Sequence, residues 1–322
     1  MLLHTSSDHL LAGTVIYQSN SPRAEYVLSS KLKSDNNLVY RIKIKDGTAI
    51  EKDAVAKWTN HDEGSDNKTT RERAIDREIE ILAKLRQFRH SGIVQIRSMP
   101  TTSTGNTAHY WAESPLAQVG KFFITEYLPH NSLSQWSKGK PYQKDLEWVI
   151  GSFEGVLSAL ALAHQQGIIH LDVKPSNILF RSTDKQGRPS EPVLIDWGGA
   201  RYLTDDLRGQ QYSEGYSAPE RKTASSPDPN MDVWALGGVL YAMLTGQAPS
   251  AKDSNLSEKI NVGNSETLHG LRKLIRDMRL QKPTDRIPIT DIQKRLTALK
   301  VLAKREAYAP QSPGRLKNIW AF

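Results

Sequence analysis

The stretch from Ile168 to Phe180 places a polar loop between two short apolar runs. Its residues, Ile-Ile-His-Leu-Asp-Val-Lys-Pro-Ser-Asn-Ile-Leu-Phe, predict a strand, a loop stiffened by proline and a second strand. Buried strands at both ends hold such a loop rigid, which makes it a good support for an acid, a base and an amide. An ordinary polar turn has a similar composition, because Pro-Ser-Asn is common turn chemistry. The remainder of the chain decides between these two interpretations.

Four segments near the N-terminus predict strands of an antiparallel sheet, because short apolar runs alternate there with turn signals. They are residues 13–17, 26–32, 38–44 and 54–58. In the third segment, Tyr40, Ile42 and Ile44 fall on one face while basic residues fall on the other, which is the period of a strand. Lys57 differs from those basic residues, because its run, Ala-Val-Ala-Lys-Trp, has no polar neighbour.

Residues 71–88 show the spacing of an amphipathic helix with an apolar stripe along one face. Glu78 lies next to this stripe. If it leans inward it can meet Lys57, whereas an exposed glutamate would pair with Arg77 or Arg86 on the same helix. The segment by itself does not favour either orientation.

The hydrophobic period changes near residues 127–131. Before that point we expect two further strands, at residues 93–97 and 122–126, separated by a hydrophilic insertion at residues 101–120. After it, helical spacing appears at residues 146–166, 231–245, 267–280 and 289–303. The chain is therefore expected to be an α+β protein in which a strand-rich unit meets a helix-rich unit, and a cleft between two units is a common ligand site.

The composition narrows the class of protein. Hydrophobic residues make up 38% and charged residues 24% of the 322 residues, which is a globular balance. The absence of cysteine excludes disulfides, thiol catalysis and thiolate metal sites, and it fits a reducing, cytoplasmic location. The longest weakly polar run, residues 233–246, is shorter than the roughly 20 residues that span a bilayer. Residues 1–8 do not form a signal peptide pattern, so we expect no membrane partner.

The net charge of +8 suits an acidic partner such as a nucleotide, a nucleic acid or an acidic protein segment. Across residues 71–89, however, basic residues alternate with acidic residues. Such alternation is typical of a solvated helix face and not of a phosphate track. We therefore do not expect nucleic-acid binding as the main role.

The loop at residues 168–180 resembles the catalytic loop of eukaryotic-like protein kinases, in which His-Arg-Asp is followed by Asn five residues after the Asp. The corresponding residues here are His170, Leu171, Asp172 and Asn177. Lys174 stands two residues after the Asp, as in Ser/Thr kinases and unlike Tyr kinases. The run Gly13-Thr14-Val15 is similar to the lead-in of bacterial members of this family.

Further matches follow in the order that this family has them. They are Lys57, Glu78, the segment Asp196-Trp197-Gly198 with Trp where the family has Phe, the segment Ala218-Pro219-Glu220, residues 232–237, and Arg286, which lies where the family has the ion-pair partner of Glu220. The resemblance covers roughly residues 26–300 and implies a bilobal protein-kinase-like fold, with a small antiparallel-sheet lobe carrying one helix and a larger, mainly helical lobe. The expected division is an N-terminal extension (1–25), an N-lobe (26–128), a C-lobe (129–303) and a C-terminal tail (304–322).

The resemblance implies an ATP-dependent kinase that transfers the γ-phosphoryl group to a Ser or Thr hydroxyl of a protein substrate. Asp172 would orient the hydroxyl and take its proton, and Lys174 would offset charge that builds on the γ-phosphate. Asn177 and Asp196 would supply hard oxygen ligands for Mg²⁺. Positioning and charge neutralisation, more than covalent chemistry, are what this reaction requires.

The same resemblance implies a nucleotide site. Lys57, held by Glu78, would grip the α- and β-phosphates of ATP. The backbone of Glu126 to Leu128 would meet the adenine ring, and Thr125 would line the back of its pocket.

The loop expected to lie over the phosphates, residues 32–37, departs from the family pattern because it contains none of the three usual glycines. Ser34 and Asn37 of this loop are still expected to contact the nucleotide. Glycine allows backbone N–H groups to close over phosphates, so side chains here, including the acidic Asp35, are expected to weaken ATP binding or to reshape the loop. Alternatively, the loop becomes ordered only with a regulatory protein partner.

Leu171 is the second departure. In most relatives an arginine at this position pairs with a phosphorylated activation loop, and leucine cannot bind a phosphate. We therefore expect activity that does not depend on activation-loop phosphorylation. The alternative is a pseudokinase, an interaction module with weak or no nucleotide binding, and the missing glycines motivate it. Transfer to a small molecule is less favoured, because residues 212–220 resemble the segment that seats a peptide beside the acceptor hydroxyl.

Overall fold

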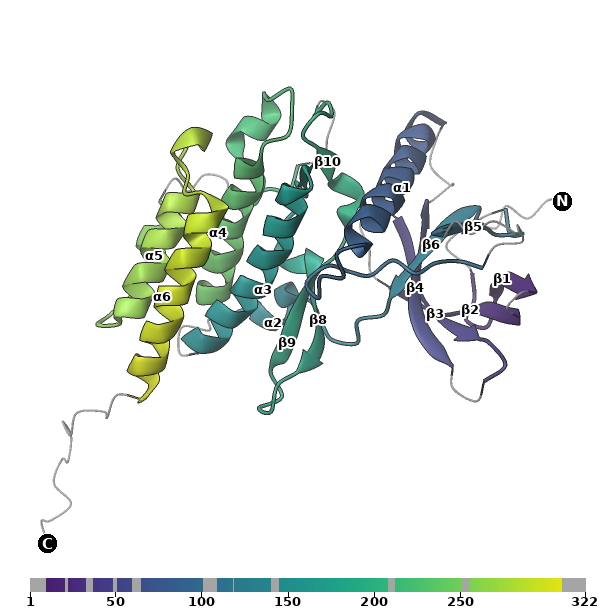
Figure 1. Ribbon diagram of the computed structural model, residues 1–322, viewed down its shortest axis with the longest axis horizontal. Coiled ribbons are helices and arrows are strands. Elements are labelled where there is room, and N and C mark those ends of the chain that lie inside the picture. The colour runs from purple at the N-terminus through teal and green to yellow at the C-terminus, as the bar shows by residue number, and fades with distance from the viewer. Residues whose placement is uncertain are drawn as a thin grey trace, which may run out of the picture.

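The computed structural model describes residues 10–20, 23–32, 37–48, 51–59, 65–100, 109–117, 119–139, 145–207, 212–250 and 255–308, with the backbone alone for residues 37 and 65–71. The elements in these ranges form two lobes (Figure 1). One lobe consists of a sheet and the helix α1, and the other consists of helices with short strands at its surface toward the first lobe. This is the α+β, bilobal architecture that the resemblance implies.

The sheet has six strands in the order β1-β2-β3-β4-β6-β5, and every neighbouring pair is antiparallel. The strands are β1 (Val15–Asn20), β2 (Arg23–Leu32), β3 (Asn37–Lys45), β4 (Lys52–Thr59), β5 (Trp111–Glu113) and β6 (Lys121–Glu126). The period-two prediction for β3 is confirmed: Tyr40 and Ile42 are buried, and the Tyr40 ring stacks on Trp58 at 4.9 Å between centroids. On the opposite face, Arg41 pairs with Asp53 across the β3–β4 ladder.

Three sequence predictions about this lobe differ from the structure. Residues 93–97 are not a strand, because their backbone bonds to two different partners: Val94 N donates to Leu194 O in the other lobe, and Arg97 N donates to Ile124 O of β6. The short strand β5 lies inside the expected insertion, where three residues are too few to produce a periodic signal. The expected boundary at residue 26 falls within β2, which pairs with β1.

The helices are α1 (Ser65–Arg86), α2 (Leu133–Ser137), α3 (Leu146–Gln165), α4 (Pro229–Thr245), α5 (Glu266–Met278) and α6 (Ile289–Tyr308). The four long helices of the second lobe lie where helical spacing predicts them. Their first turns have local causes: Asp145, Asp228 and Ser265 accept backbone N–H groups at the starts of α3, α4 and α5. Helix α1 begins six residues before the predicted start, in a polar segment without apolar periodicity.

Helix α3 is the central element of the helical lobe and packs against α4, α6 and β9. It is the one helix of the described residues whose length and apolar composition would suit a membrane span, and 61% of its apolar window is buried inside the protein. A mostly buried apolar helix is also what the core of a large lobe requires.

Short strands flank or pack beside the polar loop of residues 168–180. They are β7 (Ile168–Ile169), β8 (Ile178–Thr183), β9 (Pro189–Leu194) and β10 (Arg201–Tyr202), with β7 paired to β10 and β8 paired to β9. Ile168, Ile169 and Ile178 are fully buried. The strand, loop and strand prediction is therefore confirmed, and a single 3-10 turn at Pro175–Asn177 leads from the loop into β8.

Candidate active site

The start of the polar loop is fixed by a buried carboxylate from α4. The Asp232 side chain is fully buried and accepts the backbone N–H groups of His170 and Leu171, both at 2.8 Å. It also meets His164 Nε2 at 2.9 Å. Burial tends to raise the pKa of Asp232, but the bonds from His164 and from the loop backbone outweigh this effect and hold the pKa below its ordinary value. Asp232 is therefore a charged residue that fixes the backbone position at which the loop leaves β7.

Leu171 adopts a left-handed backbone conformation, with φ of 64°, which is uncommon for a residue other than glycine. Both of its backbone polar groups are held: its N–H donates to Asp232, and its carbonyl accepts the guanidinium of Arg221. Such a conformation persists only where the surroundings determine it. The turn at Leu171 therefore places Asp172 directly after a backbone reversal.

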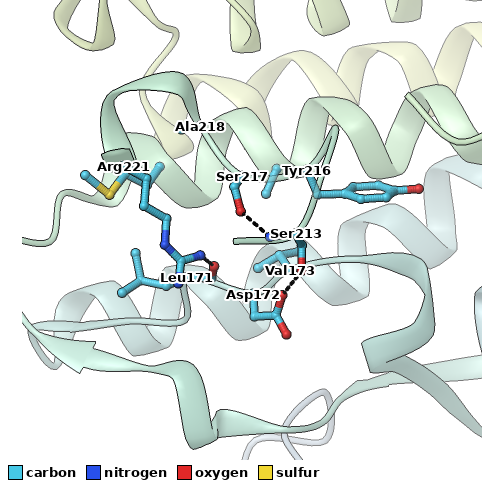
Figure 2. Close-up of a pocket in the computed structure, with 10 residues that line it drawn as sticks. Leu171, Asp172, Val173, Ser213, Tyr216, Ser217, Ala218 and Arg221 are labelled. Atoms are coloured by element: carbon cyan, nitrogen blue, oxygen red, sulfur yellow. Dashed lines mark hydrogen bonds between the residues drawn. The ribbon is translucent and has the colours of Figure 1, made fainter. Parts of the chain in front are cut away.

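Three polar side chains converge around Asp172. The amide nitrogen of Asn177 donates to the Asp172 carbonyl at 2.9 Å and to its Oδ2 at 3.0 Å. Lys174 Nζ lies 3.0 Å from the same Oδ2. Ser213 Oγ donates to Oδ1 at 2.7 Å (Figure 2). Lys174 Nζ also donates to Ser213 Oγ at 3.3 Å. The carboxylate of Asp172 is thus oriented by neighbours on both oxygens and remains 22% exposed.

The two lobes meet through a three-residue charge cluster. Lys57 Nζ of β4 lies 2.6 Å from Glu78 Oε2 of α1 and 2.7 Å from Asp196 Oδ1, which follows β9. The side chains of Lys57 and Glu78 are 10% and 4% exposed, whereas that of Asp196 is 43% exposed. Of the two orientations left open by the sequence, Glu78 adopts the inward one. Its neighbour Arg77 turns away and pairs with Asp205.

The charges in this cluster depend on one another. Burial lowers the pKa of Lys57, but the carboxylates of Asp196 and Glu78 outweigh burial and leave that pKa above its ordinary value. Lys57 in turn holds the pKa of Asp196 down, while burial raises the pKa of Glu78. One cation thus faces two carboxylates, and the one at Asp196 is accessible to solvent.

Asn177 and Asp196 fit the expected role as magnesium ligands. The amide nitrogen of Asn177 is occupied by Asp172, so its amide oxygen is the atom that would bind a metal ion. Asp196 offers an exposed carboxylate. Within the described residues no group of three or more His, Asp or Glu side chains is able to hold a metal ion. Two protein oxygens suit Mg²⁺, which is commonly bound by one or two protein ligands together with waters and substrate phosphates.

The segment after β6 presents the backbone expected to meet adenine. The Glu126 carboxylate is bound to Arg181 Nη2 at 2.8 Å and to the Gln95 N–H at 3.0 Å, so it holds the start of this segment in place. Leu128 is buried. Ser34 lies outside the described residues, and only the backbone of Asn37, at the start of β3, is described. The nucleotide contacts expected of Ser34 and Asn37 therefore stay predictions.

Trp197, where the family has phenylalanine, is fully buried beneath the polar loop. Its ring meets the His170 ring edge to face, with 4.6 Å between centroids, and its Nε1 donates to Leu194 O at 3.3 Å. Asp196, directly before it, has a φ of 60°. The buried indole thus fixes the backbone turn from which Asp196 reaches Lys57.

A second ion pair anchors the segment that follows. Arg286 binds Glu220 through two parallel bonds of 2.6 and 2.8 Å, and its side chain is fully buried. This is the pairing that the resemblance implies. Local sequence patterns do not indicate the roles of Asp232, Arg221 and Arg181. The sequence signal that could have identified Asp232 is its place as an acidic residue in the first turn of an otherwise apolar helix.

His170 should make the protein less stable in acid. Asp172 N donates to His170 Nδ1, and Nε2 faces the Ile195 carbonyl, so both ring nitrogens are used by the neutral imidazole. Burial lowers the pKa of His170 from 6.5, so below that pH the unfolded chain binds the proton more readily than the folded protein. We expect the free energy of unfolding in urea to fall between pH 7 and pH 5, and His170→Phe to show a smaller fall. An equal fall in both proteins would contradict this assignment.

The comparisons with known proteins agree with this geometry. The model of the protein kinase domain matches residues 39–305. The chain is 36% identical over 147 residues to the serine/threonine-protein kinase ULK3 of Xenopus laevis, which covers 43% of this chain and 30% of that protein. It is 29% identical over 183 residues to the SNF1-related protein kinase catalytic subunit alpha KIN12 of Arabidopsis thaliana, which covers 54% of this chain and 35% of that protein. A third relative is the calcium/calmodulin-dependent protein kinase cmkB of Emericella nidulans, at 33% identity over 125 residues, 38% of this chain and 30% of that protein.

The matched regions therefore span about a third of the length of these relatives. The family model, in contrast, covers both lobes, from β3 to α6. The sheet with its single helix, the helical lobe, and the match over most of the chain together show that this chain belongs to the protein kinase family.

Proposed function

We propose that the protein is an active, ATP-dependent Ser/Thr protein kinase that transfers the γ-phosphoryl group of ATP to a hydroxyl of a protein substrate. The observation that carries this proposal is the simultaneous formation of two clusters. Lys57 contacts both Glu78 and Asp196, and Asp172 is oriented by Lys174 and Asn177. A chain that served only as an interaction module would not require both clusters to be assembled.

The roles of the side chains follow from charge and reach. Magnesium-bound ATP supplies the phosphoryl group and part of its charge neutralisation. Lys57 offers a buried cation for phosphate oxygens, and Glu78 keeps its ammonium group in place. Asp172 offers a carboxylate oxygen to the acceptor hydroxyl and takes its proton, and Lys174 offsets negative charge beside it. A Ser hydroxyl already donates to this carboxylate from Ser213 at 2.7 Å, which shows that a hydroxyl fits there.

A narrow pocket, too small to hold a substrate side chain, lies next to Asp172. Figure 2 shows it between the polar loop and the segment around Ser213. Its lining is largely apolar and includes Leu171, Val173, Tyr216, Ala218 and Met231. The segment that resembles a peptide-seating segment therefore packs directly against the polar loop beside Asp172, which supports a protein substrate over a small molecule.

The proposal extends to regulation without activation-loop phosphorylation. Leu171 is buried in an apolar cluster with Leu207, Ala218 and Met231, so apolar packing joins the polar loop to the following segment. Further along, Arg77 of α1 donates to Asp205 Oδ2 at 2.6 Å. The α1 arginine is thus already paired with a carboxylate of the chain itself. These contacts form without a phosphate group.

We expect the double variant Tyr202→Phe, Thr204→Ala to transfer phosphate at a rate within about twofold of the wild type, because Thr204 is exposed and Tyr202→Phe keeps the partly buried ring. Both residues lie in the segment that would carry a regulatory phosphate, and Thr204 is exposed. The measurement is initial-rate transfer from γ-labelled ATP to casein, using protein that mass spectrometry shows to be unphosphorylated. A collapse of the rate would overturn phosphorylation independence while leaving the proposed chemistry intact.

The proposed activity itself is tested by the same transfer assay with the full chain. The expected result is labelled casein in the presence of Mg²⁺ and none after chelation of the metal. Phosphoamino-acid analysis should find label on Ser or Thr. Absence of transfer with several generic protein substrates would favour the pseudokinase alternative.

A further inference from the structure

Besides Arg286, which binds Glu220, another buried arginine contacts the segment around Gly215. It passes beside α4. Arg279 follows the last residue of α5, is 6% exposed, and lies over the Trp234 ring at 4.1 Å from the centroid. Its Nη1 donates to the carbonyl of Gly215 at 3.1 Å and to that of Trp234 at 3.4 Å. Burial, together with the charge of Arg286, lowers the pKa of Arg279 to about 10, so the guanidinium remains charged at neutral pH. None of the carboxylates in the described residues lies within ion-pair distance of it.

Two adjacent glycines of α4 make room for this side chain. A Cβ atom at Gly237 would lie 2.7 Å from Arg279 Cγ, which is closer than real Cβ contacts allow. A Cβ atom at Gly238 would lie 3.1 Å from both Arg279 Nη1 and Tyr216 Cδ1. The arginine therefore crosses α4 through a notch that the glycines at these positions leave open. Beyond the notch it meets the turn that carries Tyr216.

The turn at Gly215 is held on two sides. Gly215 has a φ of 78°, and a Cβ atom there would lie 2.0 Å from the Pro249 carbonyl. On its other side the Gly215 carbonyl accepts from Arg279. The turn also has internal bonds, because Ser217 N donates to Ser213 O at 2.8 Å and Tyr216 N donates to it at 3.2 Å. Residues 213–217 thus form a compact unit, which we call the peptide seat.

The peptide seat is directly connected to the candidate chemistry. Its first residue, Ser213, donates to Asp172 Oδ1, and its residues Tyr216 and Ser217 line the pocket beside Asp172. A displacement of Gly215 would move Tyr216 on one side and Ser213 two residues away on the other. The carbonyl that Arg279 holds therefore belongs to the turn that connects Tyr216 to Ser213, the residue bonded to the proposed base Asp172.

We infer that Arg279 is a positioning residue that holds the peptide seat in its binding shape through the notch at Gly237 and Gly238. This inference rests on the proposed protein kinase function for its substrate. A buried cation without a carboxylate partner lowers stability. Its benefit here is a charged hydrogen bond to a carbonyl that no apolar residue of similar size would hold. Arg279 acts through Gly215 and does not touch the substrate itself.

The main test is Arg279→Met, which keeps a long unbranched side chain over Trp234 and removes the hydrogen bond. By hydrogen–deuterium exchange, we expect the amides of Tyr216 and Ser217 to exchange about tenfold faster than in the wild type, while amides in the centres of α4 and α5 do not change. The melting temperature should stay the same or rise, because a buried charge is lost. With casein as substrate, KM should increase about tenfold while the KM for ATP changes less than twofold.

Two further variants sharpen this test. Gly238→Ala should crowd Nη1 and Tyr216 and produce the same pattern, and its combination with Arg279→Met should have less than the summed effect, since both act on one contact. Arg276→Met is the matched control, because this arginine lies on the exposed side of α5 and pairs with Asp277. It should change neither the exchange of the peptide seat nor the KM for casein.

The outcomes separate the inference from the function on which it rests. If Arg279→Met leaves both the exchange of the peptide seat and the KM for casein unchanged, the inference is wrong. It is also wrong if exchange increases evenly through α4 and α5 with a lower melting temperature, because Arg279 then has a purely structural role. If the wild type transfers no phosphate, the proposed function fails, and the exchange measurement still decides whether Arg279 holds the seat.

Discussion

Asp172→Ala is expected to lower phosphoryl transfer by a factor of about 10² to 10⁴, the range that a positioned general base contributes. The reason lies in the environment of this carboxylate. Ser213 holds Oδ1, while Asn177 and Lys174 hold Oδ2, so the group has one orientation and a partly exposed face. Alanine removes both the proton acceptor and the group that aims the hydroxyl. ATP binding should change less than twofold, because Asp172 does not belong to the Lys57 cluster.

The measurement is the initial rate of transfer to casein at saturating ATP, together with ATP affinity by calorimetry. Asp291→Ala is a suitable control, because this carboxylate lies on α6 and pairs with Lys294 at the surface. The control should keep the wild-type rate and melting temperature. A rate for Asp172→Ala within tenfold of the wild type would show that another group takes the proton. Loss of ATP binding in the same variant would point to damage beyond the catalytic step.

Lys57→Met should abolish measurable transfer, with a loss of at least about 10²-fold, and should also destabilise the fold. The ammonium group faces Glu78 at 2.6 Å and Asp196 at 2.7 Å. Its removal leaves a buried carboxylate without a cation, and breaking a buried pair in this way costs about 3–5 kcal/mol. ATP affinity should fall as well, because the proposed contact with the α- and β-phosphates is lost.

The stability loss in Lys57→Met should depend on pH in a defined direction. Without the cation, the pKa of Glu78 rises further above its ordinary value than burial already raises it. A carboxyl group whose pKa is raised in the folded state favours folding at low pH and opposes it as pH rises through that pKa. The deficit in unfolding free energy should therefore be larger at pH 8 than at pH 5.5.

The double variant Lys57→Met, Glu78→Gln separates stability from chemistry. Neutralising Glu78 removes the unpaired charge, so part of the stability should return and its pH dependence should shrink. Transfer should not return, since glutamine restores no cation for phosphate. Denaturant unfolding at the two pH values gives the stability, and the casein assay gives the activity. Full recovery of transfer in the double variant would contradict the role proposed for Lys57.

Local sequence patterns predicted the elements of the fold well where the pattern was long. The period of two in β3 and the helical spacing of α3 to α6 both correspond to the structure. These patterns succeed because each lobe buries one face of each element, and burial imposes the period on the sequence. Short segments were not predicted correctly. The strand β5 was missed because it has three residues, and residues 93–97 are not the predicted strand because they bond to partners in two lobes.

The orientation of Glu78 was not predictable from its helix. Arg77, Arg86 and Lys57 were all plausible partners within reach of a glutamate at that position. The structure assigns Arg77 to Asp205 and Glu78 to Lys57, because α1 packs with its apolar stripe against the sheet and the turn at Trp197. The choice depends on how α1 is rotated, and that rotation is set by packing across the whole lobe.

The sequence by itself determined which chemical groups the protein carries and in what order: a lysine in an apolar strand, a glutamate on a helix, a polar loop with Asp172 and Asn177, and a leucine between His170 and Asp172. Only the tertiary structure decided which of these groups meet. Lys57 reaches Asp196 across 139 residues, and Arg279 reaches Gly215 across 64. Local patterns report burial within one element, whereas such contacts depend on how separate elements pack, and no period in the sequence records that.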